Sequence, residues 1–180
     1  SVAPDRVGGR EEVLVLPFLP LPDAAGARRI LGDRKAALEA MLKQSADPDD
    51  VNPARYQVLW AESLVRAVEE KRSPQSVSVP AQALRINDAA VVGVAGELFI
   101  EVQLAIKKAS PFGSTLVAAY SNGCVGYIPV AEAYPDGGYE VDHSYKGYRL
   151  LTAIAPGAAE KVAEAAIKML RALAEEKDSQ

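Results

Sequence analysis

The sequence predicts an α/β fold, a layered half-domain with a mixed, partly antiparallel sheet and helices packed mainly on one face of it. Segments with strand patterns and segments with helical periodicity alternate along the chain, as in layered α/β architectures. Residues 77–95 read as an antiparallel hairpin that turns at Asn87–Asp88. A helical pattern over 98–108 then separates this hairpin from a further strand at 114–120. Together these observations place helices and strands in one layered unit.

The first half of the chain carries two amphipathic helices. Residues 1–10 are expected to form an irregular lead with Gly8–Gly9 as a breaker, followed by a short apolar strand at 13–16. Asp23 is a predicted N-cap of the first helix. Residues 45–53 read as a loop, and the cap–proline pair Asn52–Pro53 predicts the start of a second helix that ends before 73–74.

The second half holds the sheet. Pro80 within the strand pattern of 77–86 predicts an edge position or a bulge. A last extended segment is expected at 148–156, before a final helix opened by Pro156. The residues expected on the buried face of that helix are Val162, Ala165, Ala166, Met169, Leu170 and Leu173. The expected organisation is an irregular lead at 1–10, a single α/β domain at 11–175 and a polar tail at 176–180.

Composition excludes several classes of function. The chain has 180 residues, 49% of them hydrophobic, and a net charge of -4 without a basic block, which argues against a nucleic-acid surface. No apolar run reaches the roughly 18 residues of a membrane span. Cys124 and His143 are the only cysteine and histidine, so an intrachain disulfide and a histidine-rich zinc site are excluded. Without a Gly-x-Ser-x-Gly elbow, a serine-hydrolase triad is not indicated either.

Tyrosines gather in one glycine-rich part of the chain. Of seven tyrosines, six lie between Tyr120 and Tyr148. Glu97 follows one predicted strand, and residues 122–127 follow the next. Ligands in open α/β sheets bind beyond the carboxyl ends of the strands, so this edge is the candidate site. The alternative is that these segments are turns whose tyrosines cover the end of the sheet.

Residues 84–140 contain five short motifs: Gly96–Glu97 before a helix, Ser121–Asn122, Gly126–Tyr127, Glu132–Ala133–Tyr134 and Tyr139–Glu140. With these motifs the segment resembles the C-terminal half of the catalytic domain of the neutral/alkaline, non-lysosomal ceramidase family, in the style of its short bacterial members. A looser resemblance extends over residues 11–173.

The resemblance implies a zinc amidohydrolase that cuts the amide of an N-acyl sphingoid base. It implies that Glu97 and Tyr127 are metal ligands and that Tyr139 binds and polarises the substrate amide as a catalytic residue. Asn122 and Gly126 are expected to shape the loop that carries Tyr127. Zinc lowers the pKa of bound water and polarises a carbonyl, and a tyrosine hydroxyl can stabilise the developing oxyanion. The family's two zinc histidines have no counterpart in this sequence.

The expected partners follow from that absence. They are the N-terminal half of the same catalytic domain, or a second chain, and a lipid-like or other N-acyl amide as substrate. This chain alone is expected to hold no zinc and to be inactive. The resemblance implies a secreted or periplasmic location, with the cytoplasm as the alternative.

A non-catalytic binding or structural module that keeps the fold without the metal is the alternative function. In that reading Glu97 caps its helix and Tyr127 is a packed aromatic side chain. In either reading Tyr134 is expected to be structural, Cys124 to be buried and His143 to lie in a loop.

Overall fold

The computed structural model describes residues 6–44, 47–72 and 76–176. They divide into a first unit (up to residue 17, 76–144 and from 154 onward) and a second unit (18–75 and 145–153). In chain order the strands are β1 (Val7–Pro17), β2 (Ser76–Ile86), β3 (Ala89–Val94), β4 (Glu97–Leu98), β5 (Ser114–Ala118) and β6 (Tyr127–Ile128). The helices are α1 (Ala24–Gln44), α2 (Pro48–Glu69), α3 (Ile100–Ala109), α4 (Ser144–Gly147) and α5 (Ala158–Glu175), with a 3-10 turn at Ala131–Ala133 and a π-helical turn at Tyr139–His143. None of these helices in the described part of the chain is long and apolar enough to cross a membrane.

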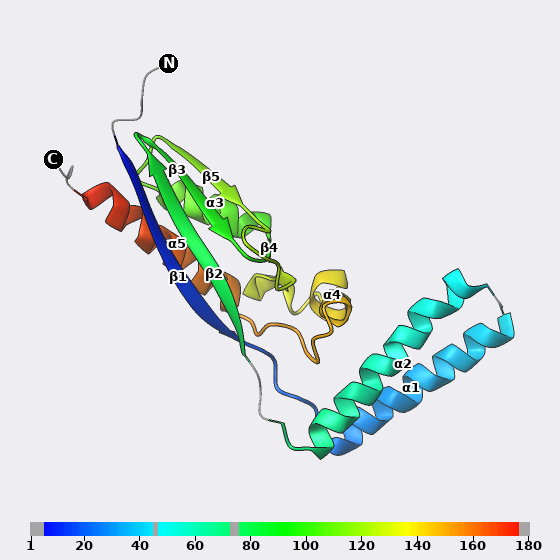
Figure 1. Cartoon of the computed structure of the whole chain (residues 1–180). Helices are drawn as coiled ribbons and strands as arrows, with labels where there is room; N and C mark the ends of the chain where they lie inside the picture. Colours follow the sequence, from blue (N-terminus) through cyan, green and yellow to red (C-terminus); the bar gives the residue numbers. More distant parts are fainter. Residues whose placement is uncertain (1–5, 45–46, 73–75, 177–180) are drawn as a thin grey trace. The chain divides into compact units, whose positions relative to one another are not determined.

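A mixed sheet forms the centre of the first unit (Figure 1). Its strand order is β1-β2-β3-β5. The β1–β2 and β2–β3 pairs are antiparallel, whereas β3 and β5 are parallel and are connected through α3. The hairpin expected at 77–95 is confirmed, and its turn places Asn87 at a φ of 54°. The predicted mixed α/β fold is therefore correct.

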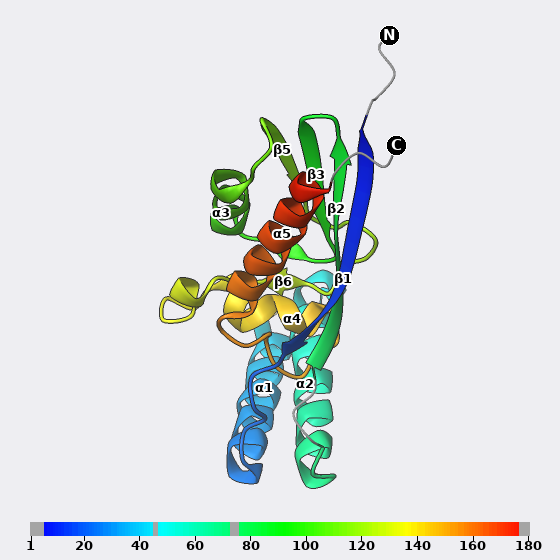
Figure 2. The ribbon, with the colours of Figure 1, turned by 90° about the vertical axis from the view of Figure 1, so that its left-hand side faces the viewer.

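The helices α3 and α5 cover the same face of this sheet (Figure 2). Alternate strand residues point toward them and are buried, among them Leu16, Val79, Ala81, Ala83, Ala90, Val92, Val94 and Val117. All six apolar residues expected on the inner face of α5 are buried, and Leu170 and Leu173 are fully inaccessible. Helical periodicity in the sequence therefore identified the core-facing side of α5.

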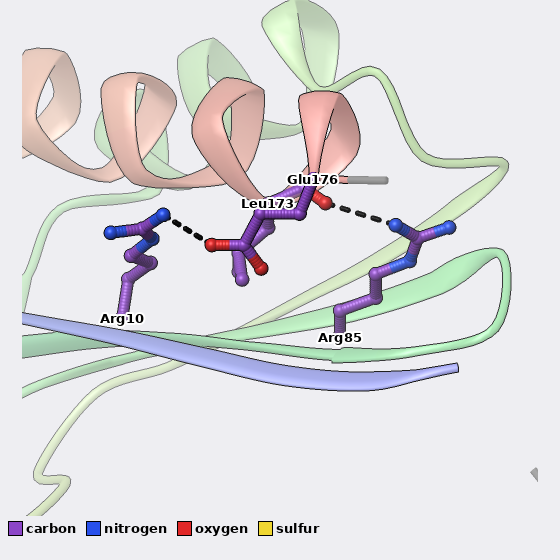
Figure 3. Close-up of polar contacts among 4 residues, drawn as sticks. All are labelled: Arg10, Arg85, Leu173 and Glu176. Carbon is purple, nitrogen blue, oxygen red and sulfur yellow. Dashed lines mark hydrogen bonds and ion pairs between the residues drawn. The ribbon is translucent and has the colours of Figure 1, made fainter. Parts of the chain in front are cut away.

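The last turn of α5 is bound to the sheet by two arginines (Figure 3). Arg10 forms an ion pair with Glu176, and Arg85 Nη1 donates a hydrogen bond to the Leu173 carbonyl oxygen at 2.9 Å. Carbonyl groups in the last turn of a helix have no partner within the helix, so Arg85 satisfies one of them. A Cβ atom at Gly8 would lie 3.2 Å from Leu173 Cδ2. Strand β1 begins at Val7, earlier than expected, because Val7 and the two glycines after it pair with the end of β2 from Ile86 onward.

Strand β2 lies between β1 and β3, so Pro80 is not on an edge strand of the sheet. The pairing of β2 with β3 begins at Ala81, opposite Val94. Pro80 lies just outside this β2–β3 pairing, so the N–H donor that proline lacks is not needed for a bond to β3. The expectation that Pro80 lies on an edge strand is therefore wrong. Proline is tolerated in this inner strand because the short strand β3 does not pair with residue 80.

The second unit contains the helices α1 and α2. Asp23 Oδ1 accepts a hydrogen bond from the Gly26 N–H at 2.6 Å, which confirms the predicted cap of α1. Helix α2 begins at Pro48 rather than at the expected Asn52–Pro53, because Asp47 is the N-cap and accepts from the Asp49 N–H at 2.9 Å. The sequence contains two cap–proline pairs, and the earlier one starts the helix.

Residues 145–153 complete this second unit. Trp60 Nε1 donates to the Leu150 carbonyl oxygen at 3.0 Å, and the Trp60 and Tyr145 rings meet edge to face at 6.0 Å. Residues 148–156, expected to be extended, form turns and irregular chain with a single bridge at Ile154. This expectation was wrong for most of the segment, because extended pairing is limited to backbone bonds on either side of Ile154 and the rest of the segment forms turns.

Candidate functional site

Glu97 and Tyr127 lie opposite each other in a short parallel pair of strands. Residue Glu97 of β4 is in register with Tyr127 of β6, and Leu98 is in register with Ile128. The Glu97 N–H also donates to the Gly126 carbonyl oxygen at 2.9 Å. Paired residues of neighbouring strands project to the same side and are about 4.8 Å apart along the hydrogen-bond direction. The structure therefore brings the two side chains together on one face.

Glycines permit this close pairing. A Cβ atom at Gly96 would lie 2.6 Å from Ile128 Cδ1, so a larger residue has no space before Glu97. Gly126 has a φ of 93°, a left-handed conformation that side chains with a Cβ rarely adopt. Asn122, at a φ of 62°, occupies a bend of the same loop. That Asn122 and Gly126 shape this loop stays a prediction.

A carboxylate with two phenols forms the polar centre of the site. Glu97 is only 7% exposed, and the Tyr120 hydroxyl donates a hydrogen bond to its Oε2 atom. This hydrogen bond is the main reason why the pKa of Tyr120 is raised to about 12. Burial, then the charge of Glu97 and a hydrogen bond to it, raise the pKa of Tyr127. At neutral pH both phenols are protonated, and they stabilise the buried carboxylate.

Tyr139 stands at the rim of this centre. Its ring meets the Tyr127 ring edge to face, with centroids 6.1 Å apart, and Tyr127 makes the same kind of contact with Phe99 at 6.4 Å. Tyr139 is 61% exposed, so its hydroxyl is not packed in the core. Glu97, Tyr127 and Tyr139 are therefore brought into one neighbourhood, as expected from the sequence.

The loop that carries Tyr139 is held by Asp142. The Gly138 N–H donates to Asp142 Oδ2 at 2.9 Å, and a Cβ atom at Gly137 would lie 2.4 Å from that same oxygen. Both glycines have positive φ, at 65° for Gly137 and 100° for Gly138. These contacts start the π-helical turn at Tyr139 and place its ring against Tyr127.

Three other residues near the site have different roles. The Tyr134 hydroxyl donates to the Ile154 carbonyl oxygen, and burial raises the pKa of Tyr134 to about 12. Both observations fit the structural role expected for Tyr134. Cys124 is exposed rather than buried, because it lies in the loop between β5 and β6. His143 ends the π-helical turn and is exposed.

Tyr120 is the site residue that sequence reasoning did not assign. It follows β5, whereas Glu97 follows β3, and these parallel strands end at the same edge of the sheet. The Tyr120 N–H also donates to the Gly96 carbonyl oxygen at 3.1 Å. The signal that could have found it is therefore its position immediately after a strand parallel to the one preceding Glu97.

The donor set of the site is incomplete for zinc. Within residues 6–44, 47–72 and 76–176, no group of three His, Cys, Asp or Glu side chains could hold a metal ion. A protein zinc ion usually takes about three or four side-chain ligands. Glu97 offers a carboxylate and Tyr127 a phenol next to it. These residues fit part of a zinc site and do not fit a whole one.

The titration of the phenols is a first testable consequence. Because Tyr120 and Tyr134 have pKa values raised from 10.0 to about 12, they are expected to ionise last in a spectrophotometric titration of the tyrosines. Their protonated forms stabilise the fold below pH 10, and this contribution is lost as the pH rises toward about 12, because the unfolded chain loses these protons first. Tyr120→Phe and Tyr134→Phe should each remove one late transition, whereas Tyr56→Phe, on exposed α2 surface, should leave both. Retention of both late transitions in Tyr120→Phe, or of both in Tyr134→Phe, would contradict the assignment.

Comparison with known proteins finds likeness in structure alone. No family model matches the sequence, and no curated protein matches it. The structure is similar to that of neutral ceramidase from Pseudomonas aeruginosa, with a TM-score of 0.48 and 17% identity over 93% of this chain and 29% of that chain. It is also similar to a ceramidase complexed with C2, with a TM-score of 0.44 and 20% identity over 60% of this chain and 17% of that chain. The chain spans less than a third of the length of either of these proteins.

Proposed function

We propose that this chain is the C-terminal portion of a zinc-dependent amidohydrolase resembling neutral ceramidases. Glu97 and Tyr127 are two of the metal ligands, and Tyr139 contacts the substrate amide. The observation that carries the proposal is the in-register pairing of Glu97 with Tyr127, with the Tyr139 ring edge-on to Tyr127 at 6.1 Å. Glu97, Tyr127 and Tyr139, three of the motif residues on which the family resemblance rests, lie close together.

Each residue has a distinct task in this proposal. A bound zinc ion supplies a Lewis acid for the amide carbonyl and a water of lowered pKa. Glu97 is a buried carboxylate whose orientation is set by the Tyr120 hydroxyl. The pKa of Tyr127 is raised by burial and by the charge of Glu97, and a cation between them would offset that charge and favour the phenolate. The exposed hydroxyl of Tyr139 is available to hydrogen-bond a substrate oxyanion.

The rest of the site comes from outside this chain. The remaining ligands, histidines by the family resemblance, belong to the N-terminal half of the catalytic domain or to a second chain. Tyr120 and Tyr139 are 59% and 61% exposed although they belong to the site, which leaves surface for a complementary part to cover. The substrate class is an N-acyl amide of lipid-like character. The chain alone is inactive.

Calorimetric titration with zinc tests the proposal. The chain alone should show no sub-micromolar zinc binding, because it supplies only part of the ligand set. The chain combined with its complementary half should bind zinc stoichiometrically. Glu97→Ala should abolish that binding, whereas Glu101→Ala, on the exposed side of α3, should retain it.

The titration has three informative contrary results. Tight binding by the chain alone that is lost in Glu97→Ala would show that the chain completes the site itself. Retention of zinc by Glu97→Ala in the combined protein would remove Glu97 from the ligand set. Absence of zinc from the combined wild-type protein would favour the non-catalytic module.

A further inference from the structure

A second candidate site lies in the second unit, which contains neither Glu97 nor Tyr127. A cavity of about 310 Å³ is lined by residues from the segment after β1, from α2 and its C-terminal end, and from residues 149–152. All of its lining residues belong to the second unit. Ligand pockets usually measure about 300–1,000 Å³, so this one has room for a small ligand.

Among the residues that the structure describes, the charged lining of the cavity is positive. Arg66, Arg72 and Arg149 line it, and no carboxylate of the described part of the chain does. Arg72 is paired with Glu70, at 2.8 Å from Nε and 2.7 Å from Nη2 to the same carboxylate oxygen. Arg66 and Arg149 form no ion pair with another residue of the described chain. Two guanidinium groups are therefore available for an anion.

The remaining lining is largely apolar and is held in place by hydrogen bonds. Leu19, Leu150 and Leu151 are among the lining residues. The Leu19 N–H donates to the Ala153 carbonyl oxygen at 2.8 Å, and the Leu19 carbonyl oxygen accepts from Thr152 Oγ1 at 2.8 Å. Trp60 Nε1 donates to the Leu150 carbonyl oxygen at 3.0 Å. These bonds connect the segment around Leu19 to residues 150–153, and they connect residues 150–153 to α2. The apolar surface of the cavity is therefore preformed.

The backbone also constrains the position of Arg149. Its φ of 59° is left-handed, a conformation in which a residue with a Cβ is strained. The Arg149 N–H donates to the Lys146 carbonyl oxygen at 3.0 Å, and the Leu150 N–H donates to the Tyr145 carbonyl oxygen at 3.1 Å. These two bonds close a tight turn. At its left-handed position, which glycine would occupy without strain, the chain has an arginine that lines the cavity.

We propose that this cavity binds a small amphiphilic anion, a carboxylate with an alkyl tail of medium length. The carboxylate pairs with the guanidinium groups of Arg66 and Arg149, and the tail packs on the leucine walls. Arginine presents a planar fork of donors that matches a carboxylate, and the apolar lining excludes water from the tail. Neither a short anion without a tail nor a neutral alcohol with one satisfies both parts of the cavity.

Calorimetric titration of the full chain with octanoate, acetate and octanol tests this site. Octanoate should bind at least tenfold more tightly than either of the other two. Arg66→Gln should weaken octanoate binding by about tenfold or more, the effect of losing a hydrogen bond to a charged group. Arg149→Gly should do the same without disturbing the turn, because glycine suits the positive φ at that position. The matched control is Arg55→Gln, an exposed arginine of α2 outside the cavity lining, which should bind octanoate as the wild type does.

Several results would overturn the proposal. These are no octanoate binding up to millimolar concentration, octanol binding as tight as octanoate binding, or octanoate affinity unchanged in both cavity variants. Circular dichroism melting of each variant verifies the fold. A loss of binding in Arg55→Gln equal to that in Arg66→Gln would show that general surface charge, rather than the cavity, attracts the anion.

Discussion

Replacement of Tyr139 by phenylalanine is expected to lower kcat for N-acyl amide hydrolysis by about 10²-fold or more in the complete enzyme, as for the loss of one oxyanion donor. The substitution removes only the hydroxyl and keeps the ring. The edge-to-face contact with Tyr127 at 6.1 Å is a ring contact, so it persists and the Tyr127 side chain stays in place. The zinc content should therefore be unchanged. Steady-state kinetics together with metal analysis of the same sample measure both quantities.

Tyr56→Phe is the matched control for this substitution. Tyr56 is 70% exposed on α2, and its loss of a hydroxyl should leave kcat unchanged. Equal turnover of wild type and Tyr139→Phe would remove the catalytic role of Tyr139. A parallel loss of zinc and turnover would show instead that Tyr139 positions Tyr127 and does not contact the reacting amide.

The sequence predicted those parts of the fold in which local pattern and tertiary packing agree. The turn at Asn87–Asp88, the hairpin around it and the inner face of α5 were all correct, because each depends on turn chemistry or on a strong period of apolar residues. The proximity of Glu97 to Tyr127 could be anticipated from their positions after successive strands.

Other features depend on contacts between distant residues, which periodicity does not contain. The start of β1 at Val7 depends on its pairing with Ile86 of β2, 79 positions away in the chain. The role of Tyr120 depends on the parallel pairing of β3 with β5. The arginine-lined cavity joins residues near Leu19 to residues near Thr152, which are 133 positions apart in the chain. None of these long-range contacts can be inferred from the apolar periodicity of a single helix or strand.

The glycine before Glu97 should be one of the most sensitive positions in the first unit. In Gly96→Ala the new Cβ atom would lie 2.6 Å from Cδ1 and 3.1 Å from Cγ1 of Ile128, and 3.4 Å from the Gly126 carbonyl oxygen. Ile128 is fully buried, so the end of its side chain cannot move into solvent. Overpacking of this kind costs about 1–3 kcal/mol. The free energy of unfolding, measured by denaturant titration, should fall by that amount, and the β4–β6 pair that aligns Glu97 with Tyr127 should be displaced.

A double-mutant cycle with Ile128→Val isolates the cause of that loss. Valine lacks Cδ1, the atom at 2.6 Å, so Gly96→Ala should cost less in the Ile128→Val background than in the wild type. Gly32→Ala is the matched control. Gly32 lies in α1, and a Cβ atom added there would meet no other atom within 4 Å. It should raise the free energy of unfolding by about 0.4–1 kcal/mol, since alanine restricts the unfolded chain more than glycine does. Equal costs of Gly96→Ala in both backgrounds would mean that contact with Ile128 is not what requires glycine before the carboxylate, and the packing explanation for the Gly96–Glu97 step would have to be abandoned.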